Sequence, residues 1–331
     1  MTSGSTGQPV SVVKTVEDEG LWDRALDERL YRELGLPDNL VRLDLSGGPG
    51  VPELVRMSSF PRPAADISLR TWDAANPAAR EEYRFVLGSI IPDLVFGSPM
   101  CILGAVSILE ELGTKLRPRA VITAYEHLSA SARRRMAEAF SCRIVELYGT
   151  VEAGFVGWSC AEDRIHVQTD GIHVELIHEG PAADSGLFDI TLTSLFARAM
   201  PILRYQPGDL TSGFISFSCG CGSPLPAFAD LLGRGNQRLS SADGRLFSHS
   251  DVEFHLDRFH VSEYQLIQRG TGEITLILPP RYAAQAAEIA DALTHGLARQ
   301  FDPEAQLTIV PQATGKWHLT ARGKRNSIVT T

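Results

Sequence analysis

The chain has 331 residues, of which 44% are hydrophobic, and its formal net charge at pH 7 is −9. That length can bury a sizeable core in about two domains. The negative charge argues against a nucleic acid or an anionic membrane as partner, because both need a clustered positive field. No apolar run reaches the roughly 18 to 20 residues that span a bilayer, and no secretory signal opens the sequence. We therefore expect a cytoplasmic protein.

The first half of the sequence alternates between helical and strand-like patterns. Hydrophobic residues at a spacing of three to four predict helices over 19–34, 102–112 and 129–140. Segments rich in β-branched residues predict buried strands at 119–124 and 143–148. Helices that alternate with buried strands are typical of an α/β domain, so we expect a mostly parallel sheet.

The pattern changes after Glu152. Short alternating segments at 173–177 and 188–193 are separated by glycine and proline, which predicts an antiparallel, β-rich layer. A domain boundary is expected near 233–237. Beyond it, a long helix over 281–301 lies between two predicted strands, which indicates a smaller α+β unit.

A loop rich in glycine and hydroxyl side chains, TSGSTGQP, occupies residues 2–9. Glycines let backbone N–H groups approach an anion, and Ser and Thr hydroxyls donate hydrogen bonds to its oxygens, so this loop suits a polyphosphate. The loop carries no lysine of the Walker type. Taken alone, it fits a linker-like N-terminus equally well.

Two further motifs place polar groups where ligands bind in α/β proteins. The motif ELYGTVEAG at 146–154 follows a predicted buried strand, so Tyr148 and Glu152 fall at the carboxyl end of that strand. The motif RYQPGDL at 204–210 ends a turn with Asp209, whose carboxylate suits the hydroxyls of a ribose. Each motif is a weak signal on its own.

Two shorter motifs follow, GRGN at 233–236 and RGKR at 322–325, the second of which contains Lys324. The polar residues of these motifs also have ordinary structural explanations. Tyr148 can close the end of a strand, Asp209 can be a turn acid, and Lys324 can be a solvated charge. The order and spacing of the whole set are more specific than any single fragment.

In this set of motifs the sequence resembles the adenylate-forming superfamily of acyl-CoA synthetases, peptide-synthetase adenylation domains and luciferases. The segments at 193–195 and 198–205 resemble the branch of phenylacetate-CoA ligase and the CapK-like proteins. The resemblance runs from Thr2 to the C-terminus. It implies a large α/β domain with a mostly parallel sheet and a β-rich subdomain, followed by a small mobile α+β domain. The ATP- and acid-binding core would be 1–233, and the mobile lid 234–331.

The resemblance implies ATP-dependent activation of a carboxylic acid as its acyl-AMP, with Mg²⁺ as cofactor and CoA as the leading acceptor. Lys324, Glu152 and Thr6 would be catalytic, with Lys324 bridging the substrate carboxylate and the α-phosphate, and Asn236 would be the hinge. The implied ligands at the phosphates are Ser3, Gly4, Ser5, Thr6 and Gly7, with Thr150 at the α-phosphate and Arg234 at the phosphate near the hinge. Glu126 and Tyr148 would line the adenine site, Asp209 would bind the ribose, and Gly149 would be a further cofactor-binding residue. Glu152 would help to bind the Mg²⁺.

The sequence departs from the family pattern at several positions. Val151 stands where a Thr or Ser usually precedes the acid, so Thr150 is the remaining hydroxyl for the α-phosphate. Residues 125–127 replace the usual adenine wall, and Asn236 replaces the usual acidic hinge residue. Relatives carry a long segment before the phosphate loop, whereas this loop begins one residue after Met1. We expect a misassigned or truncated start; the alternative is a reduced form whose missing strands a partner supplies or the fold dispenses with.

A possible zinc site is formed by Cys160, His166, Cys219 and Cys221, a Cys₃His set suited to tetrahedral coordination. Some proteins like phenylacetate-CoA ligase resemble this chain in carrying such a cluster. An odd number of cysteines makes a disulfide framework a poor explanation, and ordinary buried thiols are the alternative. Because the protein would supply every ligand, the zinc would be structural.

Three functions stay open on the sequence. The first is an acyl-CoA or aryl-CoA ligase, and the second is an adenylating enzyme that passes its acyl group to an amine or a carrier protein in natural product biosynthesis. The third is a non-catalytic relic that binds nucleotide, against which Glu152, Asp209 and Lys324 together argue. The substrate would be a small-molecule carboxylic acid, and Tyr125 would suit an aromatic one. A homodimer is compatible with the sequence.

Overall fold

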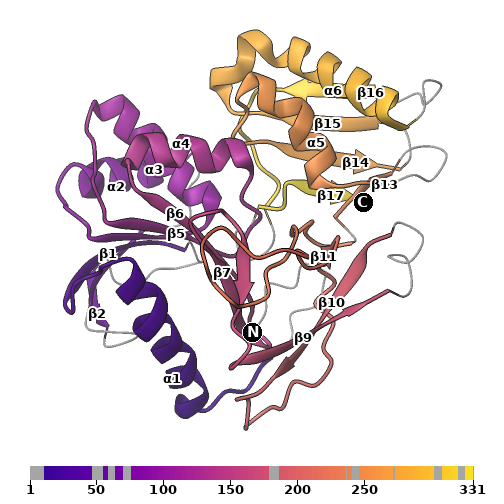
Figure 1. Ribbon diagram of the computed structural model, residues 1–331. Coiled ribbons are helices and arrows are strands. Elements are labelled where there is room, and N and C mark those ends of the chain that lie inside the picture. Colours follow the sequence, from indigo (N-terminus) through magenta and orange to yellow (C-terminus); the bar gives the residue numbers. More distant parts are fainter. Residues whose placement is uncertain are drawn as a thin grey trace.

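The computed structural model describes residues 11–46, 55–58, 64–69, 76–178, 186–235, 237–240, 246–270, 273–301, 308–319 and 325–330. An eight-stranded sheet and a separate four-stranded sheet organise them (Figure 1). We call the described residues up to 235 the large unit and those from 237 onward the C-terminal unit. In Figure 1 the C-terminal unit, orange and yellow, lies above the large unit.

The large sheet has the strand order β2-β3-β1-β4-β5-β6-β7-β8. Its strands are β1 (Leu40–Leu45), β2 (Val55–Ser58), β3 (Ala64–Ser68), β4 (Leu94–Gly97), β5 (Ala120–Thr123), β6 (Arg143–Thr150), β7 (Gly154–Ser159) and β8 (Ile165–Val167). Neighbours from β3 to β6 pair in parallel, whereas β2, β7 and β8 pair antiparallel. The predicted mostly parallel sheet is confirmed.

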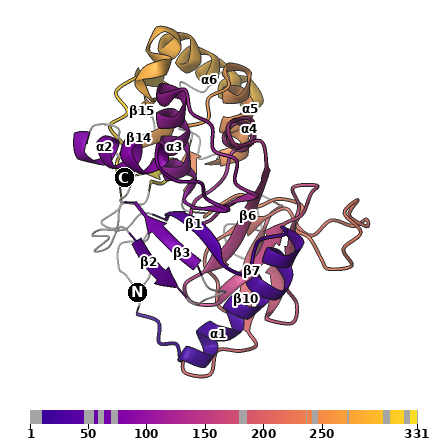
Figure 2. The same ribbon diagram turned by 90° about the vertical axis from the view of Figure 1, so that its left-hand side faces the viewer.

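Helices cover both faces of this sheet, and Figure 2 shows them above and below it. The upper helices are α2 (Pro77–Leu87), α3 (Pro99–Leu112) and α4 (Ala130–Phe140); below lie α1 (Val16–Ala25) and a π-helix (Leu26–Tyr31). Successive strand residues serve opposite faces, since Val121 packs with the upper helices and Ile122 with the lower ones. Such strands must be apolar on both faces, which explains their continuous hydrophobic runs.

The N-terminal helix differs from its prediction. A single helix over 19–34 was expected, but the helix begins at Val16, and the turns from Leu26 to Tyr31 are π-helical. Leu26 and Leu30 are buried, as their spacing predicts. Hydrophobic spacing locates the buried face of a helix but does not reveal a local change in backbone hydrogen bonding.

The β-rich layer of the large unit is a three-stranded antiparallel sheet in the order β11-β10-β9. Its strands are β9 (Ile172–Ile177), β10 (Phe188–Ser194) and β11 (Leu210–Thr211). Val156 and Ile165 of the large sheet share a hydrophobic core with Ile190, Leu192 and Phe228. The layer is therefore fixed to the β7–β8 end of the large sheet.

The C-terminal unit has its own sheet, in the order β16-β15-β14-β17, and its own hydrophobic core. Its elements are β12 (Leu239–Ser240), β13 (Leu246–Phe247), α5 (His249–Leu256), a 3-10 turn (Asp257–Phe259), β14 (Gln265–Arg269), β15 (Glu273–Ile277), a second 3-10 turn (Pro280–Gln285), α6 (Ala286–Phe301), β16 (Thr308–Gln312) and β17 (Ile328–Thr330). The predicted fold class, a large parallel-dominated α/β sheet with a smaller separate α+β sheet, is confirmed. The boundary at 233/234 and the mobility of this unit stay predictions.

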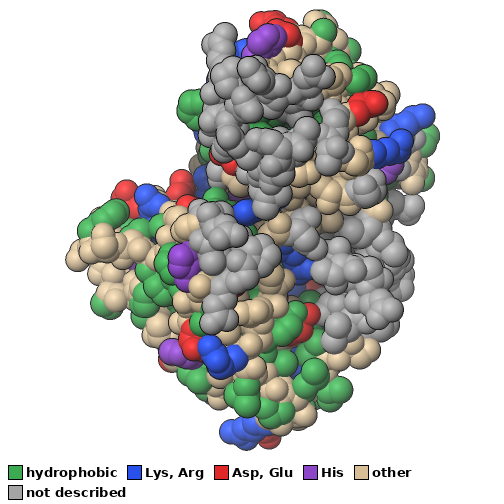
Figure 3. Space-filling view, turned by 90° about the vertical axis from the view of Figure 1, so that its right-hand side faces the viewer, with side chains coloured by type: hydrophobic (Ala, Val, Ile, Leu, Met, Phe, Trp, Pro, Cys, Tyr) green, Lys and Arg blue, Asp and Glu red, His purple; other side chains and the backbone are tan. Residues whose placement is uncertain are grey.

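The surface of the described residues mixes side chains of different kinds. On the face shown in Figure 3, acidic and basic side chains are interspersed with hydrophobic ones. Among the helices that the structure describes, none is both long and apolar enough to cross a membrane.

Candidate functional site

The carboxyl ends of β4, β5 and β6 meet at one edge of the large sheet, because these strands are parallel neighbours. The motif at 146–154 leaves the sheet at this edge, where β6 turns into β7. The pairing of these two strands shifts register between Tyr148 and Gly149. Gly149 permits this close turn, because a Cβ there would lie 2.7 Å from the carbonyl oxygen of Gly154.

Tyr148, Asp209 and Arg234, from three separate motifs, form one polar cluster at this edge. The phenol of Tyr148 donates a hydrogen bond to Oδ2 of Asp209 at 2.9 Å, and Nε of Arg234 lies 3.8 Å from Oδ1. Burial and the neighbouring Asp209 carboxylate hold the pKa of Tyr148 well above its ordinary value, so the phenol stays protonated. The Asp209 side chain is 16% exposed and that of Arg234 27%. A ligand can therefore reach both.

Glu152 lies in the turn after β6 and is oriented by a second tyrosine. The phenol of Tyr205 donates a hydrogen bond to Oε1 of Glu152 at 2.9 Å. Burial and this hydrogen bond raise the pKa of Tyr205 to about 12. Tyr205 stands in the motif at 204–210, but the sequence assigned it no role, since its partner is 53 residues away. A carboxylate such as Glu152 is a ligand type that Mg²⁺ accepts beside substrate phosphates.

Thr150 and Val151 occupy the turn that the family resemblance assigns to the α-phosphate. The Thr150 hydroxyl accepts a hydrogen bond from the backbone N–H of Ala153 at 2.9 Å. A hydroxyl can accept one hydrogen bond and donate another, so this contact leaves Thr150 a donor for a phosphate oxygen. The Val151 side chain, 45% exposed, offers no such donor.

Glu126 links the two units. Its Oε2 accepts a hydrogen bond from the backbone N–H of Met100, at the start of α3, at 3.4 Å. Its Oε1 accepts one from the backbone N–H of Arg325, in the C-terminal unit, at 3.1 Å. The predicted contact of Glu126 with an adenine stays a prediction.

Several predicted site residues lie outside the described residues, so their roles stay predictions. They are Ser3, Gly4, Ser5, Thr6 and Gly7 of the phosphate loop, the hinge residue Asn236 and the lysine Lys324. Arg325, directly after Lys324, is described and contacts Glu126. The chain next to Lys324 is thus placed at the junction of the two units.

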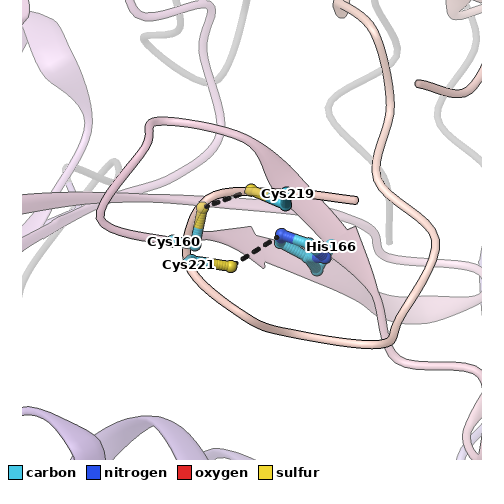
Figure 4. Close-up of side chains that lie close together, drawn as sticks. All are labelled: Cys160, His166, Cys219 and Cys221. Carbon is cyan, nitrogen blue, oxygen red and sulfur yellow. Dashed lines mark hydrogen bonds between the residues drawn. The ribbon is translucent and has the colours of Figure 1, made fainter. Parts of the chain in front are cut away.

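The predicted cysteine and histidine set does converge (Figure 4). The ligand atoms of Cys160, His166, Cys219 and Cys221 all lie within 4.8 Å of one another. Sγ of Cys160 is 3.7 Å from Sγ of Cys219, and Sγ of Cys221 is 3.4 Å from Nε2 of His166. Nδ1 of His166 lies 2.8 Å from the carbonyl oxygen of Leu225, which fixes the proton on Nδ1. The lone pair of Nε2 then faces the sulfur atoms.

This donor set fits a zinc ion. Three thiols and one imidazole nitrogen are donors that Zn²⁺ prefers, and the carbonyl partner on the far ring nitrogen is the usual support for a histidine ligand. A hydrogen bond from the backbone of Cys221, together with contacts to neighbouring ligands, outweighs burial and lowers the pKa of Cys219 to about 7. The cluster joins the β7–β8 hairpin to the loop at 219–222.

A further polar cluster, which the sequence did not predict, joins the two units. Nε2 of His127 lies 2.9 Å from Oε1 of Glu253 on α5, and the His127 ring stacks on His249 at 5.0 Å. Tyr264 also donates a hydrogen bond to Glu253, at 3.2 Å. Burial opposes protonation of His127, but the carboxylates of Glu253 and Glu146 raise its pKa to about 9. No local pattern could reveal a pair separated by 126 residues.

No family model matches this chain, and no curated protein matches it. Solved structures do match. A 2-hydroxyisobutyryl-CoA ligase in the postadenylation state, bound to 2-HIB-AMP, has a TM-score of 0.75 at 14% identity, covering 100% of this chain and 73% of that chain. An anthranilate CoA ligase bound to anthranoyl-AMP gives a TM-score of 0.62 at 15% identity, covering 98% of this chain and 64% of that chain. A benzoate CoA ligase from Burkholderia xenovorans gives a TM-score of 0.61 at 17% identity, covering 95% of this chain and 65% of that chain.

The 2-hydroxyisobutyryl-CoA ligase is also known with CoA in the thioesterification state, and that form gives a TM-score of 0.56 at 14% identity, covering 99% of this chain and 73% of that chain. This chain therefore superposes better on the postadenylation state of that ligase than on its thioesterification state. Together these likenesses show that the chain has the fold of CoA ligases that bind acyl-AMP.

Proposed function

We propose that this protein uses ATP and Mg²⁺ to activate a small carboxylic acid as its acyl-AMP, and then transfers the acyl group to the thiol of CoA. The cluster of Tyr148, Asp209 and Arg234 beside Glu152, at the carboxyl end of a parallel sheet, carries this proposal. The fold of CoA ligases supports it. Membership of the adenylate-forming superfamily, in its phenylacetate-CoA ligase branch, rests on the sequence motifs.

The residues of the cluster divide the work of holding ATP. Asp209 accepts hydrogen bonds from the ribose hydroxyls, since its two oxygens can accept more than the one that Tyr148 donates. Tyr148 lies beside the adenine, and Arg234 faces the phosphates. Thr150 donates its hydroxyl to the α-phosphate. Glu152, held by Tyr205, binds the Mg²⁺ that adds positive charge at the phosphates.

The reaction needs positioning and electrostatics more than covalent chemistry. A carboxylate oxygen of the acid attacks the α-phosphorus, the bond to the bridging oxygen breaks, and pyrophosphate leaves with the electron pair. Lys324 binds the acid carboxylate and the α-phosphate, and so neutralises charge where it develops. The CoA thiol then attacks the acyl carbon of the acyl-AMP, losing its proton, and AMP leaves.

We also propose that Cys160, His166, Cys219 and Cys221 hold one structural Zn²⁺. All four ligands come from the protein, so no position stays open for a substrate. The zinc supports the nucleotide site indirectly, because Phe228 follows this loop and packs edge-on against Tyr148 at a ring distance of 5.9 Å.

Exchange of labelled pyrophosphate into ATP tests the proposed function. The acids offered should include benzoate, anthranilate and 2-hydroxyisobutyrate. We expect exchange that depends on one class of acid, and loss of that exchange in Asp209→Ala. Asp170→Ala is the matched control, because Asp170 is a half-exposed acid that pairs with Arg29 outside the cluster. Folded wild-type protein that exchanges with no acid would favour the non-catalytic relic.

The acceptor is tested once an acid is found. CoA should yield a thioester, detected by mass spectrometry, with release of AMP. Formation of an amide, or acyl transfer to a carrier protein, in place of the thioester would favour the second enzyme function.

A further inference from the structure

Asp18, in the first turn of α1, is a buried carboxylate outside the nucleotide cluster, and the residue is only 2% exposed. Its Oδ2 accepts a hydrogen bond from the backbone N–H of Thr15 at 3.1 Å, and the Thr15 hydroxyl accepts one from the backbone N–H of Asp18 at 3.0 Å. This reciprocal pair is a capping box, which stabilises the start of a helix. A capping residue can act from the surface, so capping alone leaves the burial of Asp18 unexplained.

A distant turn covers the Asp18 carboxylate. The backbone N–H of Arg198 donates a hydrogen bond to Oδ1 at 3.3 Å, and that of Ala199 donates one to Oδ2 at 3.4 Å. The hydrogen bond from the backbone of Thr15 has the largest influence on the pKa of Asp18; with those from Arg198 and Ala199 it outweighs burial and lowers this pKa. The carboxylate is therefore ionised and can only accept hydrogen bonds. It joins the start of α1 to a turn 180 residues further along the chain.

This turn, residues 195–201, leads from the end of β10 to Tyr205, and we call it the return turn. Figure 2 shows α1 beside β10. At the base of the return turn, the backbones of Leu192 and Tyr205 exchange two hydrogen bonds of 2.8 Å. Leu192 is fully buried in the core that the β-rich layer shares with the large sheet. The return turn thus has a fixed base, and Asp18 holds its far end.

Tyr205 connects the return turn to the proposed magnesium ligand. Its phenol donates the 2.9 Å hydrogen bond to Glu152 described above. The Tyr205 ring is only partly buried at the shared core, so packing alone fixes it less firmly than a core residue. Its direction therefore depends on how the return turn is held. Removing a hydrogen-bond partner of a metal ligand commonly lowers metal affinity roughly 10- to 100-fold.

We propose that Asp18 is a positioning residue for the magnesium site, because it holds the return turn so that Tyr205 meets Glu152. The magnesium part of this inference rests on the proposed function, in which Glu152 binds the Mg²⁺ of ATP. In the sequence, α1 follows the predicted phosphate loop at 2–9. Asp18 therefore also joins the two segments that would meet the phosphates and their metal ion.

Binding of ATP with and without Mg²⁺, measured by isothermal titration calorimetry, tests this proposal without any acid. Asp18→Asn keeps the shape of the side chain but replaces one acceptor oxygen by a donor that faces backbone N–H groups. Thr15→Val removes the hydroxyl that caps α1 and leaves the contacts of Asp18 with the return turn, so it measures capping alone. Glu17→Gln is the matched control on the same helix, because Glu17 pairs with the Arg198 side chain in an exposed contact of 3.5 Å.

We expect Asp18→Asn to weaken the binding of ATP with Mg²⁺ about tenfold and to leave binding without Mg²⁺ unchanged. Tyr205→Phe should weaken binding with Mg²⁺ at least as much. The double variant should lose no more than Tyr205→Phe alone, since Asp18 acts through Tyr205. Thr15→Val and Glu17→Gln should bind like the wild type.

Four results would overturn the proposal. They are unchanged binding with Mg²⁺ in Asp18→Asn, an equal loss with and without Mg²⁺, an equal loss in Thr15→Val, and a double variant whose two losses multiply. An equal loss in Thr15→Val would show that Asp18 only caps α1. Losses that multiply would show that Asp18 does not act through Tyr205.

Amide hydrogen exchange, followed by NMR without nucleotide, tests the positioning step by itself. In the wild type, the amides of Arg198 and Ala199 should exchange slowly although both residues are exposed, because their N–H groups are bound to Asp18. Asp18→Asn should speed exchange at 195–205 and leave α3 unchanged. Fast exchange of these two amides in the wild type would overturn the proposal even if Asp18→Asn does not fold. Wild-type protein that binds no ATP would instead contradict the proposed function and the magnesium role, and the exchange rates would still decide whether Asp18 holds the return turn.

Discussion

The two faces of α4 make different kinds of contact. Met136 and Phe140 are fully buried against the large sheet, in the same core as α2 and α3. Arg134 and Arg135, on the other face, pair with acids of the C-terminal unit. Burying a large apolar side chain contributes roughly 1.5 to 3 kcal/mol, whereas an exposed ion pair contributes about 0 to 1 kcal/mol. One face therefore fixes the helix in the core, whereas the other joins the C-terminal unit through the half-exposed pair Arg134–Asp257 and the buried pair Arg135–Glu263.

The cluster of Cys160, His166, Cys219 and Cys221, proposed above to hold zinc, is tied to α4 within the large unit. Asp163 lies between Cys160 and His166, and it pairs with Arg133 of α4 at 2.8 Å. Cys219→Ser removes one ligand, so purified protein should fall from about one zinc per chain to almost none and lose much of its folded fraction. Metal analysis and soluble yield measure this.

Cys142→Ser is the control, because Cys142 is half-buried and stands outside the set. Wild-type protein that is well folded and free of metal under reducing conditions would contradict the zinc proposal.

Truncating a buried side chain on the apolar face of α4 should give the next largest loss of stability. Met136→Ala leaves a cavity in the core between α4 and the sheet and should cost about 2 to 5 kcal/mol of the free energy of unfolding. Urea denaturation measures the loss. A cost below that of the exposed-face variant Arg134→Ala would reverse the comparison between the two faces.

The stabilising effect of His127, in the loop before α4, is expected to depend on pH. Glu253 and Glu146 outweigh burial and Arg133 and raise the pKa of His127 from 6.5 to about 9, while its stacking partner His249 has a lowered pKa. The folded state binds the proton more tightly, so the stabilisation is full below pH 6.5 and is lost as pH rises through 9.

His127→Gln should accordingly cost roughly 1.5 to 3 kcal/mol near pH 6, as expected for a hydrogen bond to a charged group, and much less at pH 10. Melting temperatures of wild type and variant across this range test it. A difference that grows toward pH 10 would show that His127 is not held in its protonated form.

The smallest effect on stability is expected at the half-exposed pair Arg134–Asp257. Arg134→Ala should change the free energy of unfolding by no more than about 1 kcal/mol, because Arg134 and Asp257 are both half-exposed. Its effect should appear instead in the arrangement of the units, as faster hydrogen exchange in α5. A loss of stability as large as that of Met136→Ala would show that Arg134 contributes as much as a core residue, and would contradict the weak contribution expected of a half-exposed ion pair.

Local sequence patterns predicted the main sheet and part of the candidate site. The parallel sheet followed from buried strands between helices, and the convergence of Cys160, His166, Cys219 and Cys221 followed from residue chemistry. The spatial grouping of Tyr148, Asp209 and Arg234 agrees with the family motifs, although their roles in binding ATP stay predictions.

What the sequence could not predict depends on the packing of distant segments. The Tyr205–Glu152 hydrogen bond, the His127–Glu253 pair and the arginines that face Glu263 join residues far apart in the chain. Arg134 and Arg135 belong to a run of three arginines whose partners in the C-terminal unit no local pattern reveals. The π-helical turn after Ala25 likewise leaves the hydrophobic spacing almost unchanged.

Acid-dependent pyrophosphate exchange by Lys324→Ala, beside wild type and Lys316→Ala, tests the central claim most directly. Lys316 is an exposed lysine that also follows a glycine, so it is the internal control. We predict that Lys324→Ala loses exchange on the order of a hundredfold or more while its melting temperature stays unchanged, because the contact acts as charge develops. Lys316→Ala should keep wild-type exchange. Full exchange in Lys324→Ala would contradict the proposed role of Lys324 in acid activation.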